Sequence, residues 1–241
     1  MLKNDLMPIP LFHEVGIESG FSGPGSKYIV SRKHYIDFVR ALSNCNFKSP
    51  CITFDDGGKS NLDAVEIAIQ YGVSVKIFVP TMFVGMRNFL SREDLIELNK
   101  LKQVEIGSHS VNHPNYFNAL SKKQQLYELS ESKKYLEDVI QKDVGIFSIP
   151  GGVASHSAIS TAGLIYNETY SSWQSGLLSS SSIPRVSIES KNIIRLTNAM
   201  KEGRIDYLNA ITGDVKLMLL SVASVVFPAL FKKSAKSVAP K

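Results

Sequence analysis

Several features that mark other protein classes are scarce or missing in this chain of 241 residues. The only cysteines are Cys45 and Cys51, and they form no metal-binding motif, so we expect reduced thiols rather than a disulfide. Residues 1–10 include charged side chains and have no apolar segment typical of a secretory signal. These absences lead us to expect a cytoplasmic protein.

The net positive charge is also small outside one segment. The net charge is +5, and residues 213–241 contribute +4 of it through five lysines against one aspartate. No basic stripe with interleaved aromatic residues occurs, so we expect no nucleic-acid partner. With 44% apolar and 20% charged residues, the chain has the composition of a globular protein with one sizeable core.

No apolar run is long enough to cross a membrane. Residues 217–231 are uncharged and precede Lys232 and Lys233, but a membrane span needs roughly 20 apolar residues. Two interpretations of this segment stay open. It forms either a helix packed on the rest of the protein or, through residues 217–233, a peripheral contact with the inner face of the membrane. We therefore divide the chain into a catalytic domain at 1–212 and an apolar, basic tail at 213–241.

Strand-like and helix-like segments alternate along the chain. Helical periodicity and capping residues predict helices between the apolar strand segments. This alternation favours a parallel sheet covered by helices, either open or closed into a barrel, with active groups at the C-terminal ends of the strands. The expected strands are residues 9–15, 51–54, 73–79, 104–107 and 144–149.

Two adjacent acids, Asp55 and Asp56, follow the apolar run at residues 51–54. Neighbouring carboxylates at the end of a buried strand repel each other and are costly to desolvate unless a cation compensates them. His109 and His113 follow another expected strand. One carboxylate and two imidazoles suit a divalent metal, zinc above all, in a catalytic site with an open position. We therefore expect Asp56, His109 and His113 to be metal ligands.

Asp55 is then free for a second task. A carboxylate beside a metal can act as general base toward water, while the metal polarises a carbonyl. The departing amine would need a proton, so a general acid is expected on the other side of the site.

The segments that carry these residues resemble a known family. Residues 53–57 (TFDDG) and 109–113 (HSVNH) are similar to the first two motifs of the polysaccharide deacetylases, the NodB-homology group of carbohydrate esterase family 4. The resemblance spans roughly residues 8–175. It implies an α/β fold, a distorted (β/α) barrel of about seven parallel strands, and metal-dependent removal of an N-acyl group, usually acetyl, from an amino sugar. It also implies that Asp55 is the base and that Asp56, His109 and His113 hold the metal.

The chain departs from the third motif of that family. The family usually places an arginine two residues before a proline, where it orients the base, but this chain has Ser148 before Pro150. Serine cannot supply a charged bidentate donor. Arg185 is a candidate replacement, although a surface cation after the serine-rich segment is an equally good interpretation. We assign Arg185, together with Pro150 and Gly151, to the substrate-binding region.

The fourth and fifth motifs are also altered. Trp173, the only tryptophan, is expected to line the acyl pocket, with a packing role as the alternative. The fifth motif, Leu-x-His, usually lies near the C-terminus and supplies the general acid. Here residues 11–13 have that form, so we expect His13 to be the acid, as in circularly permuted members of the family. His156 is a weaker alternative, and His34 is expected to be solvated on a helix.

The resulting hypothesis is a metal-dependent deacetylase that acts on an amino sugar in a glycan or a lipid-linked sugar. Two alternatives stay open. One is a barrel that has lost catalysis and binds glycan, and the other is an enzyme that deacylates a small non-sugar amide. The short chain favours a short or lipid-linked glycan over a cell-wall polymer.

Overall fold

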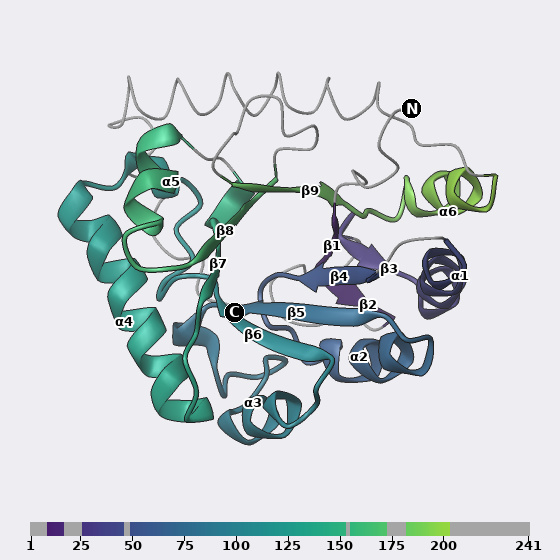
Figure 1. Ribbon diagram of the computed structural model, residues 1–241, viewed down its shortest axis with the longest axis horizontal. Coiled ribbons are helices and arrows are strands. Elements are labelled where there is room, and N and C mark those ends of the chain that lie inside the picture. The colour runs from purple at the N-terminus through teal and green to yellow at the C-terminus, as the bar shows by residue number, and fades with distance from the viewer. Residues whose placement is uncertain (1–8, 17–25, 46–48, 153–154, 173–181, 203–241) are drawn as a thin grey trace.

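The computed structural model describes residues 9–16, 26–45, 49–152, 155–172 and 182–202. Seven parallel strands close into a barrel, which confirms the predicted fold class (Figure 1). Because the first and last strands pair directly, segments from both ends of the described chain lie side by side. In order around the barrel, the strands are β1 (Ile9–Phe12), β4 (Cys51–Phe54), β5 (Ser74–Val79), β6 (Val104–Ser108), β7 (Ile146–Ser148), β8 (Glu168–Ser171) and β9 (Ile183–Ser187).

Six α-helices surround the barrel in the described part of the chain (Figure 1). Two begin with capping boxes that the sequence predicts, in which Ser91 pairs with Asp94 and Ser121 pairs with Gln124. These caps satisfy backbone N–H groups that the first helical turn leaves unpaired. The helices are α1 (Arg32–Ser43), α2 (Asn61–Gln70), α3 (Arg92–Asn99), α4 (Lys122–Ile140), α5 (His156–Ala162) and α6 (Ile193–Lys201).

Side chains that alternate along each strand divide the core into two layers. Phe54 points to the helices and packs against Phe12 and Tyr35. Its neighbour Thr53 points into the barrel, where it accepts a hydrogen bond from Arg185. Phe78, Ile146 and Tyr170 form a separate apolar cluster. The guanidinium of Arg185 lies 5.2 Å from the ring centre of Phe78, which places this cluster in the barrel interior.

The expected strand at residues 9–15 is wrong in its extent, because two strands of different sheets occupy it. β1 ends at Phe12, whose carbonyl accepts a hydrogen bond from Asp55 N–H. After His13, β2 (Glu14–Val15) leaves the barrel and pairs with β3 (Ile29–Val30) in a small separate sheet. The chain therefore changes sheets at His13.

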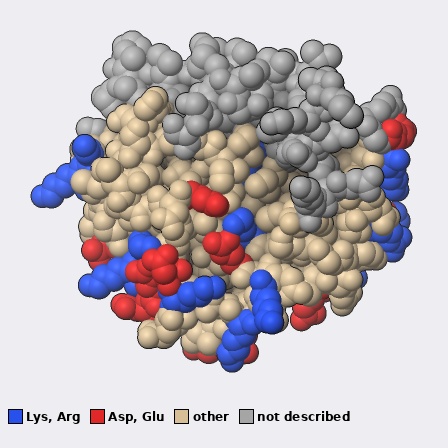
Figure 2. Space-filling view, in the orientation of Figure 1, with Lys and Arg blue, Asp and Glu red and all other residues tan. Residues whose placement is uncertain are grey.

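Several expectations fall on parts of the chain that the structure does not describe. Trp173 and the tail at residues 213–241 lie outside the described residues, so the domain boundary and the membrane contact stay predictions. Both cysteines are described, and both are free thiols. Among the described residues, no helix has the length and apolarity needed to cross a membrane. On the face shown in Figure 2, acidic and basic side chains lie next to one another.

The barrel interior predicts a sharp requirement for Gly107 in β6. A Cβ added there would lie 2.6 Å from Phe78 and 2.7 Å from Ile146, and both of these side chains are buried. We expect Gly107→Ala to lower the free energy of unfolding by about 1–3 kcal/mol, because neither neighbour has room to move. Thermal or denaturant unfolding measures this. Gly163→Ala is the matched control, since its nearest atoms lie at 3.5 Å, and equal stability of the two variants would contradict the prediction.

Candidate metal centre and active site

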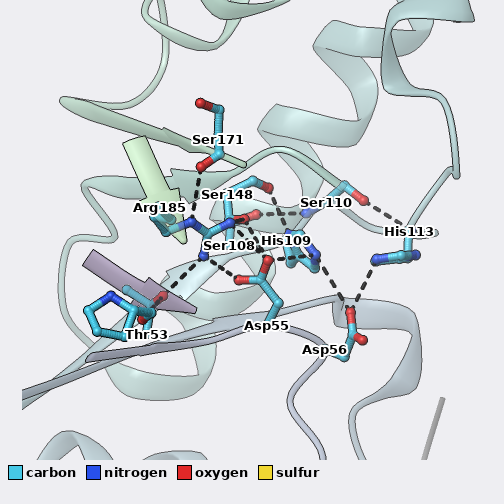
Figure 3. Close-up of polar contacts among 11 residues, drawn as sticks. Thr53, Asp55, Asp56, Ser108, His109, Ser110, His113, Ser148, Ser171 and Arg185 are labelled. Carbon is cyan, nitrogen blue, oxygen red and sulfur yellow. Dashed lines mark hydrogen bonds and ion pairs between the residues drawn. The ribbon is translucent and has the colours of Figure 1, made fainter. Parts of the chain in front are cut away.

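Buried polar side chains gather at the C-terminal ends of the barrel strands (Figure 3). Asp55 and Asp56 directly follow β4, and His109 follows β6. Each is less than a tenth exposed, as is His113. Parallel strands end at the same side of a barrel, so residues distant in sequence meet there. The predicted base and the three predicted metal ligands are thereby brought together.

Asp56, His109 and His113 form a group that fits a metal ion. Their candidate ligand atoms all lie within 4.8 Å of one another. Oδ1 of Asp56 lies 3.2 Å from Nε2 of His113 and 3.6 Å from Nε2 of His109. That oxygen is buried, and none of the described residues gives it a hydrogen bond. A buried carboxylate oxygen that faces two imidazole nitrogens is a donor set that suits a divalent metal ion.

His109 is oriented for this role by the neighbouring strand. Its Nδ1 donates a hydrogen bond of 2.8 Å to the carbonyl of Ser148 in β7. Because a carbonyl can only accept, this bond places the proton on Nδ1. The lone pair of Nε2 is then available to bind a metal, as is usual for a metal-binding histidine. Burial lowers the pKa of His109 to about 4, so the ring is neutral near pH 7. Sequence patterns do not predict that a main-chain carbonyl sets this orientation.

The backbone around the ligands is held in an unusual conformation. Asp56, Ser110 and His113 have φ angles of 71°, 70° and 49°, in the left-handed region. Residues other than glycine adopt this region rarely, at a cost of order 1–3 kcal/mol each, and such residues persist only when their surroundings hold them. The Ser110 hydroxyl accepts a hydrogen bond from His113 N–H and so contributes to that support.

Glu128 of α4 holds the loop between the two histidines. Its Oε2 accepts hydrogen bonds of 2.9 Å from the N–H groups of Val111 and Asn112, and its Oε1 accepts one of 2.7 Å from the Asn112 side chain. Glu128 is only 6% exposed. The sequence analysis missed this role. The signal available was an acid on the helix face that also carries Leu129 and Leu136, where apolar residues are expected.

Arg185 binds Asp55 across the barrel. Its Nη1 lies 2.7 Å from Oδ1 of Asp55, and its Nη2 lies 2.9 Å from Oδ2 (Figure 3). Nη2 also donates to the Ser148 hydroxyl at 2.7 Å, and that hydroxyl donates to Asp55 at 3.1 Å. Arg185 is fully buried, so the interpretation as a surface cation is wrong. Its contacts are those of a residue that orients Asp55, and Ser148 joins the same network.

These contacts decide the charges of the two acids. Burial alone would raise the pKa of Asp55, but the charge of Arg185, followed by that of His109, outweighs it and lowers the pKa. Burial alone would likewise raise the pKa of Asp56, but the interaction with His113 outweighs burial and lowers the pKa. Both acids are therefore carboxylates near neutral pH. Asp56 in turn raises the pKa of His113 against the effect of burial.

His13 lies near the same carboxylates, at the point where the chain leaves β1. Its charge helps to lower the pKa of both Asp55 and Asp56. The alternative candidate, His156, is exposed at the first residue of α5, where its Nδ1 pairs with Ser160. The role of His13 as general acid stays a prediction, and the exposed position of His156 gives no reason to prefer His156.

Pro150 and Gly151 lie just beyond Ser148. A Cβ on Gly151 would lie 2.3 Å from the carbonyl oxygen of Asn115, so this turn packs directly on the loop that follows His113. Gly151 has φ 69°, which also favours glycine. Pro150 is buried and Gly151 is exposed. Their contacts with substrate, like that of Trp173, stay predictions.

The loop contacts of Glu128 predict its effect on metal binding. Glu128→Ala removes the acceptor of three hydrogen bonds, so the His109–His113 loop should lose its fixed conformation. We expect metal affinity to fall about 10–100-fold, measured by competition with a chelator. Glu131→Ala is the matched control, because it removes the same charge from an exposed site on the same helix. A folded Glu128→Ala protein with unchanged metal affinity would contradict this role.

Comparison with known proteins agrees with this geometry. The family model described as polysaccharide deacetylase matches residues 44–165, which is half of the chain. That range holds Asp55, Asp56, His109, His113 and Ser148, whereas His13 and Arg185 lie outside it. A Bacillus subtilis protein, YxkH, which is named as a candidate polysaccharide deacetylase, is 30% identical over 116 residues. These residues are 48% of this chain and only 41% of that protein.

Solved structures share the fold at lower identity. A candidate polysaccharide deacetylase from Bacillus anthracis has a TM-score of 0.67 at 16% identity, over 80% of this chain and 68% of that one. The Streptococcus pyogenes deacetylase PplD, solved in complex with acetate, has a TM-score of 0.66 at 21% identity, over 80% of this chain and 97% of that one. With the family model covering half of the sequence, the chain belongs to the polysaccharide deacetylase family.

Proposed function

We propose that this protein is a metal-dependent hydrolase that removes an acetyl group from the nitrogen of an amino sugar. The observation that carries the proposal is the buried group of Asp56, His109 and His113 beside Asp55, a carboxylate held by Arg185. Three protein donors and an adjacent oriented base are the components needed for metal-assisted hydrolysis of an amide.

Asp56, His109 and His113 would hold the metal, and zinc is the metal that one carboxylate and two imidazoles favour. When bound, the cation supplies Lewis-acid chemistry, which polarises the acyl carbonyl and makes water easier to deprotonate. The chain itself supplies the orientation of the donors. Ser148 fixes the ring of His109, and Glu128 fixes the loop that carries His113.

Asp55 acts as general base. Its pKa is lowered mainly because the charge of Arg185 outweighs burial, so it is ready to accept a proton at neutral pH. Oδ2 of Asp55 lies 3.7 Å from Nε2 of His109, so the base borders the metal position. The two parallel hydrogen bonds from Arg185 keep the carboxylate from rotating away.

His13 acts as general acid and protonates the departing amine. An amine leaves as a neutral molecule only if it receives a proton as the carbon–nitrogen bond breaks. His13 directly follows β1, which pairs with the strand that carries Arg185, and it contributes to the lowering of the pKa of both carboxylates.

The substrate class follows from relatives rather than from a bound molecule. The family acts on polysaccharides, and the acetate in the Streptococcus pyogenes deacetylase is consistent with acetyl as the group removed. Within this class we favour a short or lipid-linked glycan at the cytoplasmic face of the membrane. A small non-sugar amide is the competing substrate, and acetate release from such an amide but from none of the N-acetylated sugars would favour it.

The test is acetate release from N-acetylated nucleotide sugars, lipid-linked sugars and oligosaccharides by the metal-loaded protein. We expect release to stop on chelation and to return with zinc. Asp55→Asn should lower kcat by about 10²–10⁴-fold with full metal content, because it removes the base but not the ligands. Asp138→Asn is the control, since Asp138 is exposed on α4. Metal binding without acetate release from any of these sugars would overturn the proposal.

The role of Arg185 has its own test. Arg185→Lys keeps the charge but cannot form two parallel bonds to Asp55, so we expect kcat to fall at least about tenfold with metal content unchanged. Arg185→Ser should lose more activity. Adding Ser148→Arg to Arg185→Ser places a guanidinium where the family usually has it, and we expect part of the lost activity to return. Full activity of Arg185→Lys would exclude bidentate orientation as the reason for this arginine.

A further inference from the structure

Within the described residues, the proposed general acid has no hydrogen bond of the kind that usually orients a catalytic histidine. Nδ1 of His13 is buried, and none of the described residues gives it a hydrogen-bond partner. In most sites of this kind a carboxylate or a carbonyl binds the second ring nitrogen and fixes the ring. Something else must therefore keep this imidazole in a productive orientation.

An aromatic ring packs against the imidazole of His13. The ring of Tyr28 lies 4.5 Å from the ring of His13, centre to centre, at an interplanar angle of 34°. The contact follows from strand register, because Glu14 of β2 pairs with Ile29 of β3. The residues one step earlier, His13 and Tyr28, therefore lie opposite each other. Ring contacts of this type are worth about 0.5–1.5 kcal/mol, enough to select one orientation of a side chain.

Tyr28 is itself anchored to the segment after β9. Nζ of its neighbour Lys27 lies 4.6 Å from the Tyr28 ring centre and 3.2 Å from Oε1 of Glu189. The carbonyl of Lys27 also accepts a hydrogen bond from Ser190 N–H. The segment that carries the Tyr28 ring is thus held by Glu189 and Ser190, which lie between β9 and α6.

The backbone of His13 has a separate anchor. The side chain of Asn61, at the start of α2, donates a hydrogen bond of 2.9 Å to the carbonyl oxygen of His13. Asn61 is fully buried. Asn61 fixes the main chain of His13, and among the described residues Tyr28 makes an aromatic contact with its ring.

We propose that Tyr28 is a positioning residue that holds the imidazole of His13 in the orientation needed for proton donation. The inference rests on the proposed function of His13 as general acid. It assigns the effect to the aromatic ring of Tyr28, not to its hydroxyl and not to a contact with the sugar.

The experiment measures kcat and KM for an N-acetylated amino sugar. A general acid contributes about 10²–10⁴-fold to the rate, and a misplaced ring should lose part of this. Tyr28→Leu should therefore lower kcat at least about tenfold while KM changes less than about twofold. Tyr28→Phe keeps the ring and should retain wild-type rates. Tyr127→Leu is the matched control, because Tyr127 is 57% exposed on α4. Loss of activity in Tyr28→Phe would overturn the role of the ring.

A double-mutant cycle separates positioning from sugar binding. In the His13→Ala background, Tyr28→Leu should cause no further loss, because its effect passes through His13. A sugar contact would instead raise KM and add its loss to that of His13→Ala, which would overturn the proposal. With 4-nitrophenyl acetate, whose phenolate leaves without a proton, we expect His13→Ala and Tyr28→Leu each to lose far less activity than with the sugar amide; an equal loss with both substrates would overturn the proposal.

A measurement without turnover tests the contact directly. The ring current of Tyr28 should displace the ring-proton NMR signals of His13, which His13→Ala identifies. We expect these signals to move in Tyr28→Leu and to stay in place in Tyr28→Phe; unmoved signals in Tyr28→Leu would overturn the proposal. A wild-type protein that releases no acetate would overturn the proposed function instead, so the two failures are distinguishable.

Discussion

The ion pair between Arg185 and Asp55 is the interaction on which the rest of the site depends. Arg185 is fully buried, and its guanidinium reaches residues of β4, β7 and β8 as well as Asp55. A pair of this kind adds little net stability, but loss of one partner leaves an uncompensated buried charge and costs about 3–5 kcal/mol. The same contacts therefore hold the barrel strands in register and keep the base ionised and oriented.

Strong local patterns made much of this predictable from the sequence. The adjacent acids after a buried strand and the two histidines after another predicted that these side chains would meet, because parallel strands end on one side of a barrel. The capping serines at Ser91 and Ser121 gave the helix starts. Local patterns of this kind can be interpreted from the sequence because each depends on residues close together in the chain.

Contacts between distant segments were not predictable in the same way. The burial of Arg185 depends on the pairing of β9 with β1, which closes the barrel, and a sequence alone made a surface position equally reasonable. The contacts of Glu128 and Tyr28 depend on how α4 and β3 pack on loops far away in the chain. The split of the first expected strand at His13 arises from pairing with a second sheet, which apolar patterning cannot reveal.

Because β9 pairs with β1 and closes the barrel, the proposed activity depends on the complete barrel. All three candidate ligands lie between residues 56 and 113, so a growing chain acquires them early. Arg185, which pairs with Asp55, is made after all of them, on the closing strand. A chain that stops before β9 would contain the three candidate ligands but would lack the arginine that holds Asp55. Under the proposed function, such an incomplete chain would be inactive because its base has no orienting partner.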